Sequence, residues 1–480
     1  MTRSARSGVA TAVLAALAGC SLAPHYEVPP MPAPPESYKE AAEWKVAVPA
    51  DGAPRGLWWT MFHDDDLDAL EAQVSAANQS LKAALAQLEQ ARAATRIARA
   101  AWFPALTAQA QATRGRSSIY SPGYVSGKTT TGNSFNASID LSWEIDVFGR
   151  IRNTVASARD TEQATAGDEA ALDLALHAEL ASDYFILRGL DVEQQLLDQT
   201  VADYAKALAL TQNLYNGGAA AILDVRQAQA QLETARTQAE DTRLRRAQTE
   251  HAIAVLVGRE ASGFTLSPQP GKKTLAAPPA VAFGLPSELL ERRPDIAAAE
   301  RRVAAANAGI GVARAAFFPV FSLPGTAGSL ATSTHAWMSA PSQYWSLGPQ
   351  VMQTLFAGGQ LWAQTAQAHA VYDQQVANYR ATVLTAYQEV EDNLAAIRQL
   401  QLESVSQAAA VTATQGALDQ ANLRYKGGIV TYLEVVSTEN AALAARLTAV
   451  DIDVRRLGAT VLLVKALGGD WPGESVTAGT

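Results

Sequence analysis

The chain has 480 residues, of which 48% are hydrophobic and 18% charged, and its formal net charge is −9. This composition is typical of a large structured protein, and the acidic balance argues against a nucleic-acid partner. Beyond the N-terminus, no apolar run approaches the roughly 20 residues of a membrane-spanning helix. If the mature chain crosses a membrane, it must therefore do so as strands.

The N-terminus has the pattern of a lipoprotein signal. Arg3 and Arg6 precede a short apolar run from Val9 to Ala18, and Leu17-Ala-Gly-Cys20 forms a cleavage box. Residues 1–19 are therefore predicted to be a removed signal peptide. Ser21 after the cysteine favours sorting to the outer membrane.

Cys20 is the only cysteine, which excludes a disulfide within the chain. Acylation at this position would anchor the protein through buried methylene groups. The alternative is an incidental small core residue. Residues 20–60, rich in proline from Pro29 to Pro35, are expected to be a lipid-anchored extended tether.

The remaining chain contains a tandem internal repeat. The block from Asn213 to Val225, with Tyr215 and Gly218, returns as Leu423 to Val435, with Tyr425 and Gly428, at an offset of 425 − 215 = 210. An upstream Phe-Pro block also recurs, which a similarity of alanine-rich helices alone would not explain. We expect repeats at 61–262 and 286–470, an inter-repeat linker at 263–285 and a C-terminal tail at 471–480.

Long proline-free intervals predict two pairs of helices. The expected ranges are Arg150–Tyr215 and Ile222–Val257 in the first repeat, and Gln360–Tyr425 and Tyr432–Leu467 in the second, each pair broken at two glycines. The longer helices would reach on the order of 100 Å. Coiled-coil-like packing would suit such lengths, and a soluble helical bundle remains the alternative.

The segment from Ser134 to Val147 alternates with a period of two. One face carries apolar residues such as Phe135, Ile139 and Trp143, and the other carries Asp140, Glu144 and Asp146. A soluble sheet has this pattern with one face in a core, and a lipid-embedded barrel has it with the apolar face outward.

Three further strands complete two predicted hairpins, at about 102–148 and 317–356. They are expected at Leu106–Thr113, Val320–Leu330 and Tyr344–Phe356, and aromatic residues gather near the strand ends. Four strands cannot close a barrel, and open edges in lipid are costly, so strands in lipid would force oligomerisation. Three copies would supply twelve strands, and two or four would also close.

The cleavage box, the proline-rich tether, Trp58-Trp59-x-x-Phe62 before Leu67, and the doubled Tyr-x-x-Gly blocks resemble the TolC family. Within it, the chain is most similar to outer-membrane lipoproteins of tripartite efflux systems. The resemblance implies a mixed α/β membrane protein: a homotrimer with a twelve-stranded transmembrane β-barrel, continuous with a long periplasmic α-helical coiled-coil tunnel. It also implies a periplasmic adaptor (membrane fusion protein) and an inner-membrane pump as partners, with no cofactor.

In that setting the glycine breaks become a periplasmic gate. Gly218 and Gly428 permit the turns, and Asp224 and Glu434 start the return helices, where a carboxylate also suits the helix dipole. The resemblance implies that Glu434 forms a ring of carboxylates at the constriction, with an apparent pKa raised by mutual repulsion.

Two departures from the family pattern affect the gate. A second acidic position is Ser437, and a salt-bridge pair is replaced by Val430 and Asn216. Closure is therefore expected to depend on helix packing, on hydrogen bonds of Tyr215 and Tyr425, and on the Glu434 ring.

Catalysis is not expected. The carboxylates Asp140, Glu144 and Asp146 lack an accompanying nucleophile or histidine, so they are predicted to line the lumen rather than to act as acid and base. The histidines that we considered have no metal-ligand spacing: His63, His177, His251, His335 and His369.

The sequence predicts a passive exit duct for drugs or other small toxic compounds, anchored in the outer membrane and extending into the periplasm. A metal-efflux duct and the duct of a type I protein-secretion system are alternatives, although secretion-linked members commonly lack a lipid-attachment box. A soluble coiled-coil scaffold is a third possibility, for which the amphipathic strands would have no use.

Overall fold

The computed structural model describes residues 21–30, 57–120, 129, 131–269, 275–279 and 293–469. The signal peptide, Cys20, most of the tether, part of the linker and the C-terminal tail lie outside these ranges. The chain divides into two compact units. The strand unit comprises residues 1–30, 87–166 and 298–380, and the helical unit comprises residues 31–86, 167–297 and 381–480.

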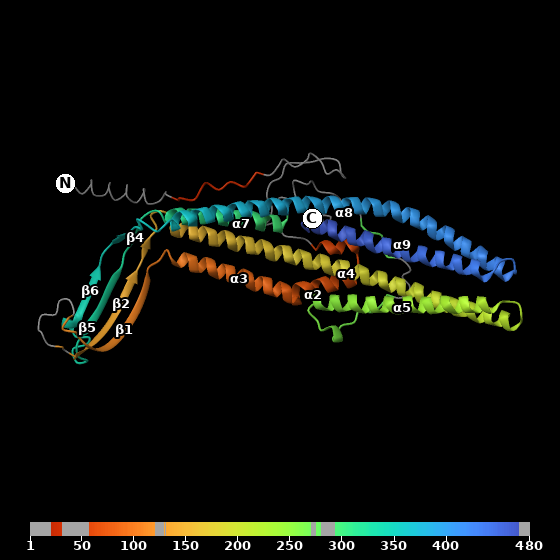
Figure 1. Ribbon diagram of the computed structural model, residues 1–480, viewed down its shortest axis with the longest axis horizontal. Coiled ribbons are helices and arrows are strands. Elements are labelled where there is room, and N and C mark those ends of the chain that lie inside the picture. The colour runs from red at the N-terminus through yellow and green to blue at the C-terminus, as the bar shows by residue number, and fades with distance from the viewer. Residues whose placement is uncertain are drawn as a thin grey trace, which may run out of the picture. The chain divides into compact units, whose positions relative to one another are not determined.

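The strand unit contains an antiparallel four-stranded sheet. Its strands are β1 (Ala105–Arg116), β2 (Thr131–Ser142), β5 (Gly325–Ala331) and β6 (Gln343–Leu347), in the order β1-β2-β5-β6. They lie side by side in Figure 1. Each repeat thus supplies one hairpin, and the two hairpins pair with each other through β2 and β5. Among the described residues, β1 and β6 each pair with one strand only.

A second, smaller sheet continues three of these strands. Its members are β3 (Glu144–Ile145), β4 (Val320–Ser322) and β7 (Gln350–Met352), in the order β3-β4-β7. The prediction of uninterrupted strands across these positions is wrong. Pro324 and Pro349 stand between the paired segments, where the missing proline N–H cannot continue a ladder. The third break, at Trp143, lies opposite the Pro324 break, and the Leu323 N–H donates to Trp143 O at 2.7 Å.

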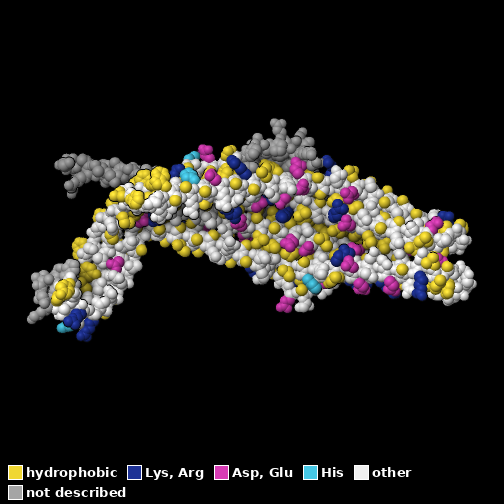
Figure 2. Space-filling model, viewed as in Figure 1, with side chains coloured by type: hydrophobic (Ala, Val, Ile, Leu, Met, Phe, Trp, Pro, Cys, Tyr) yellow, Lys and Arg dark blue, Asp and Glu magenta, His cyan; other side chains and the backbone are white. Residues whose placement is uncertain are grey.

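The two faces of the larger sheet differ in chemistry. In the register, Ile139 stands between Ala108 and Ala327, and Ala327 stands beside Trp345. Ile139 is 56% exposed and Trp345 77%, and Leu106 one row away is 68% exposed. Figure 2 shows hydrophobic side chains at the surface over the strands, with few charges among them.

The opposite face carries hydrogen-bonded polar groups. Gln109 Nε2 donates to Ser138 Oγ at 3.2 Å, and Ser138 Oγ donates to Asp140 Oδ2 at 3.1 Å. Ser138 is buried, whereas its neighbour Ile139 is not. In the middle strand β2 the apolar Ile139 is thus exposed while the adjacent polar Ser138 is buried, the reverse of a sheet that packs on a soluble core; β1 is exposed along its whole length.

The segment after Cys20 packs along the helices of the strand unit. Ser21 Oγ donates to Asn153 Oδ1 at 2.9 Å, and Asn307 Nδ2 donates to Pro24 O at 2.9 Å. The hydroxyl of Tyr26 donates to a carboxylate oxygen of Glu300. The described start of the predicted tether is therefore extended, as proline-rich sequence requires, but it is bound to the protein.

The long helices agree closely with the sequence prediction. They are α4 (Arg150–Asn216), α5 (Ile222–Leu256), α8 (Gln360–Lys426) and α9 (Tyr432–Ala466), each ending within one residue of the expected position. The shorter helices are α2 (Asp65–Ala77), α3 (Gln79–Ala100) and α7 (Pro294–Ala315). The residues of α3, α4, α7 and α8 are divided between the two units. None of the described helices combines the length and hydropathy needed to span a bilayer.

The core of the helical unit forms around the start of the first repeat. The 3-10 helix η1 (Trp58–Phe62) and helix α2 pack with the middle of α4 and the ends of α5 and α9, and Leu67, Tyr184 and Val461 are fully buried there. Nearer the glycine turns, α4, α5, α8 and α9 contact each other through small apolar clusters that contain alanine. Because alanine has a small side chain, two helices can approach each other closely where alanines face one another. The apolar surface that each helix presents to its neighbour is therefore narrow.

Candidate functional site

The two helix–turn–helix motifs of the helical unit have the same backbone geometry. Gly218 has a φ of 76° and Gly428 a φ of 71°. The next amide returns to the preceding helix in both, from Ala219 to Leu214 O at 2.8 Å and from Ile429 to Arg424 O at 2.9 Å. This glycine-dependent C-cap satisfies the last helical carbonyls, so each turn is tight. The predicted turn role of both glycines is confirmed.

The two acidic residues after these turns make different contacts. Asp224 Oδ2 accepts a hydrogen bond from the Ala221 N–H at 3.1 Å and caps α5. Glu434 instead forms an ion pair with Arg424, whose Nη1 is 3.0 Å from Glu434 Oε1. Asp224 is therefore engaged locally, and Glu434 points back at the helix that precedes its turn.

Arg424 is a residue that the sequence analysis missed. The repeat offset of 210 places it opposite Leu214, so this charge occurs only in the second repeat. Both partners of the pair are about half exposed, so the contact adds little stability. The sequence analysis expected Glu434 without a basic partner, and the structure places Arg424 beside it.

The two tyrosines of the repeat motif differ in exposure. Tyr425 packs against Tyr432, with ring centroids 5.5 Å apart, and its hydroxyl is buried without a hydrogen-bond partner in the described part of the chain. Tyr215 is 40% exposed. The predicted hydrogen bond of Tyr425 is therefore not formed among the described residues.

The three carboxylates expected to line a lumen have separate contacts. Glu144 forms a two-pronged ion pair with Arg150, at 2.8 and 2.6 Å. Asp146 accepts the backbone N–H groups of residues 151 and 152 and so caps α4. Asp140 accepts a hydrogen bond from Ser138. Two of the three thus stabilise the strand-to-helix junction, which the spacing of two residues did not reveal.

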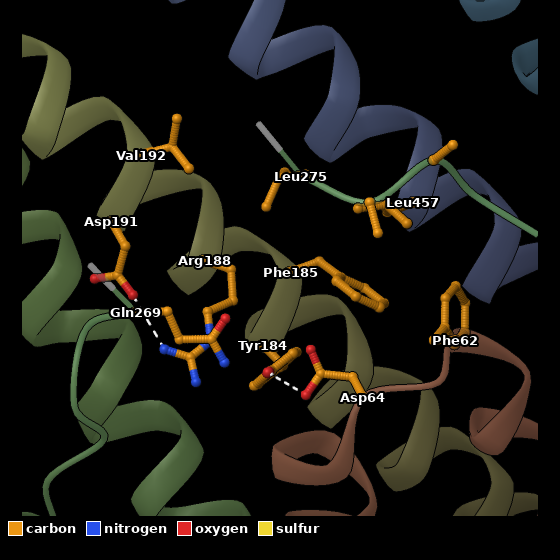
Figure 3. A pocket seen from close by; sticks show the side chains of 12 residues that line it. Phe62, Asp64, Tyr184, Phe185, Arg188, Asp191, Val192, Gln269, Leu275 and Leu457 are labelled. Atoms are coloured by element: carbon orange, nitrogen blue, oxygen red, sulfur yellow. Dashed lines mark hydrogen bonds and ion pairs between the residues drawn. The ribbon is translucent and has the colours of Figure 1, made fainter. Parts of the chain in front are cut away.

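A buried arginine lies in the helical unit. Arg188 Nη2 is 2.8 Å from Asp66 Oδ2, Nη1 is 3.2 Å from Asp191 Oδ2, and Nη1 also donates to Ser267 O at 2.9 Å. Figure 3 shows Arg188 and Asp191 beside a cavity of about 50 Å³ with Phe62 among its aromatic walls. The arginine holds the start of the inter-repeat linker against α4, and its bonds to carboxylates identify a structural role.

A buried histidine lies close to the same core. His177 Nδ1 is 2.5 Å from Glu71 Oε2, its Nε2 is 3.1 Å from Ser75 Oγ, and its ring stacks on Trp59 at 4.5 Å. Burial lowers the pKa of His177, but hydrogen bonds to Asp173 and Glu71 outweigh it and raise that pKa to about 9. The pair joins α2 to α4. No group of three potential metal ligands occurs among the described residues.

Comparison with known proteins gives the family. The model of outer membrane efflux proteins matches residues 70–259 and again 285–469, in agreement with the repeat. The chain is 33% identical over 478 residues to the probable efflux pump outer membrane protein TtgC of Pseudomonas putida, covering 98% of this chain and 96% of that one. It is 30% identical over 459 residues to the cation efflux system protein CusC of Escherichia coli, covering 96% and 97%.

A solved structure of the outer-membrane channel OprN shares the fold, with a TM-score of 0.83 and 30% identity, covering 94% of this chain and all of that one. These relatives are efflux and channel proteins rather than enzymes. A doubled family match, the helix–turn–helix pairs and the two-faced sheet agree with one another, and the chain belongs to the outer membrane efflux protein family.

Proposed function

We propose that this chain is the outer-membrane exit duct of a tripartite efflux pump and works as a homotrimer. The observation that carries the proposal is the four-stranded sheet, whose apolar face is exposed and whose edge strands β1 and β6 each have one partner among the described residues. Unpaired backbone groups in hydrocarbon cost several kcal/mol each. Pairing β1 of one copy with β6 of the next removes these edges, and three copies give a twelve-stranded barrel with a wet lumen.

The contacts of residues 21–30 support a lipid anchor that lies close to the strands of the sheet. Ser21, the first described residue after Cys20, bonds to Asn153, three residues after the start of α4 and close in sequence to β3. Acyl chains on Cys20 would then enter lipid beside the strands. Residues 1–19 would be the signal peptide, 20–60 the anchored tether, and 61–262 and 286–470 the two repeats joined by the linker 263–285.

The turns at Gly218 and Gly428 form the periplasmic gate in this proposal, with Tyr215, Tyr425, Asp224 and Glu434 around them. Asp224 shapes its turn by capping, and Glu434 supplies charge to the constriction. The ion pair with Arg424 partly neutralises that negative charge. The constriction would therefore carry both positive and negative side chains rather than a purely acidic ring. Of the carboxylates of the strand unit, Asp140 remains the best candidate for a lumen-lining group.

A periplasmic adaptor and an inner-membrane pump complete the assembly. The names of the relatives support efflux rather than protein secretion, since they describe an efflux pump and a cation efflux system. The names of these relatives leave drug efflux and metal efflux as alternatives for the compounds that this duct carries.

The test is purification of the mature lipidated protein in detergent, followed by gel analysis with and without heating and by recording in planar bilayers. A heat-sensitive trimer band and discrete ion channels are expected. A Cys20→Ala variant is the control for the anchor, because it removes the thiol that would be acylated. A wild-type protein that is monomeric and water-soluble without detergent would refute the proposal.

A further inference from the structure

The helix pairs of the two repeats meet in the helical unit along a seam between α5 and α9. Tyr432 and Val435 of α9 pack on Ala228 of α5. Polar side chains bridge the seam as well: Gln231 of α5 bonds to Asn440 of α9. Along this part of the seam, small apolar contacts and uncharged amides hold the two helices together.

Glu439 is the carboxylate at this seam. It precedes Asn440 on α9, and its Oε2 is buried without a hydrogen-bond partner in the described part of the chain. Asp203 of α4, which is also a carboxylate, repels a negative charge on Glu439. Burial, with a contribution from Asp203, raises the pKa of Glu439 to about 7.

The neighbouring groups do not offset this charge. Asp203 is ion-paired to Lys206 at 3.0 Å, and hydrogen bonds from Gln199 and Lys206 outweigh burial and lower its pKa, so it stays ionised. Arg446, farther along α9, bonds to Gln415 of α8, and its charge also lowers the pKa of Asp203, so this cation acts on Asp203.

The other groups at the seam are uncharged. The α5 helix contributes the amide of Gln231, which donates to the hydroxyl of Tyr204 of α4 at 3.1 Å. Tyr432 of α9 packs against Tyr425 of α8, and burial raises the pKa of Tyr432, so its phenol stays neutral. A negative charge on Glu439 therefore meets repulsion from α4 and no paired cation.

The first repeat lacks this acid. The offset of 210 places Gln229 at the position of Glu439, an amide of nearly the same shape. Like charges in a partly buried contact repel, whereas a protonated carboxyl can stay in it without repulsion. We propose that Glu439 makes the seam between the two repeats sensitive to pH: the neutral acid holds α9 against α4 and α5, and its ionisation loosens this contact and favours opening of the duct.

The sign of the effect follows from linkage. The tight seam raises the pKa of Glu439 from 4.5 to about 7, so the tight state binds more protons than the loose state. The tight seam is therefore fully stabilised below pH 4.5, and this stabilisation is lost as the pH rises to about 7. The ratio of loose to tight seams should rise by up to about tenfold per pH unit within that window, and then level off.

The seam itself can be measured without any channel activity. Gln229 and Ser437 are exposed residues on α5 and α9, and Gln229→Cys with Ser437→Cys would accept spin labels in the full-length protein. Labelled chains diluted with unlabelled ones report the distance across one chain. We expect the long-distance fraction to rise at least about fivefold between pH 5 and pH 7.5.

Three variants complete the test. Glu439→Gln installs the residue of the first repeat and should keep the short distance at every pH. Asp203→Asn removes the repelling charge and so stabilises the tight seam when Glu439 is ionised; it should reduce the rise of the long-distance fraction with pH. Glu240→Gln, an exposed residue of α5, should behave as the wild type.

A distance that is independent of pH in the wild type, or that changes with pH to the same extent in Glu439→Gln, would overturn the proposal. The coupling to opening depends on the proposed duct function, and conductance over the same pH range tests it separately. A responsive seam without channels would contradict the duct, whereas channels with an unresponsive seam would contradict only the role of Glu439.

Discussion

A single arginine on the apolar face of the sheet tests whether that face contacts lipid. Ile139 lies in the middle of β2, is more than half exposed and has Ala108 and Ala327 as its cross-strand neighbours. Its side chain therefore contacts the surrounding medium rather than a protein core. An arginine at the lipid face of a barrel costs about 2–4 kcal/mol near the bilayer midplane. Ile139→Arg should thus lower the folding equilibrium constant about 30- to 900-fold, since 1.36 kcal/mol is a factor of ten.

The control is a matched arginine on the other face. Thr107 pairs in register with Asp140, so Thr107→Arg places a cation beside a carboxylate on the polar face and should change stability by less than about 1 kcal/mol. Urea titration of each variant refolded into lipid vesicles gives the free energies. Equal losses in both variants, or no loss in Ile139→Arg, would show that Ile139 does not face hydrocarbon.

Three further measurements test the helical unit. Arg424→Leu, which installs the residue of the first repeat, should raise the permeability ratio of cations to anions, and Glu434→Gln should lower it; unchanged reversal potentials would contradict a role of this pair at the constriction. Gly428→Ala should cost about 1 kcal/mol in denaturant titration, because its φ is 71° while an added Cβ meets no atom within 4 Å. Burial lowers the pKa of His177, but hydrogen bonds to Asp173 and Glu71 outweigh it and raise that pKa, so the stability that its charged form contributes should be lost as the pH rises through about 9. His177→Gln should flatten this pH profile, and a profile equal to that of the wild type would exclude the imidazolium as its source.

The sequence predicted the helices well because their signals are local. Proline-free alanine- and glutamine-rich stretches favour helix at each residue, and a glycine at the C-cap ends it where a positive φ is needed. The ends of α4 and α8 were therefore expected to within one residue. The strands were predicted with the correct faces but without their breaks, although Pro324 and Pro349 could have indicated two of the three interruptions.

The candidate site was predicted only in part, because alternation gives the face of a side chain and not its partner. Asp140, Glu144 and Asp146 share one spacing, yet one accepts from a serine, one pairs with Arg150 and one caps α4. Arg424 and Glu434 are ten residues apart, and only the tight turn between them brings their charges to 3.0 Å. A comparison of the two repeats could have drawn attention to Arg424, because Leu214 replaces it.

From the sequence alone, this protein is determined to be a duplicated chain with paired long helices, amphipathic strands and a lipoprotein-like start, because periodicity and repetition are properties of neighbouring residues. The tertiary structure decided which strands pair, which carboxylates are neutralised and which are left at a seam without a cation. Those outcomes depend on distances between residues far apart in the chain, as for Asp203 and Glu439, and on burial, which removes the water that would otherwise screen such charges.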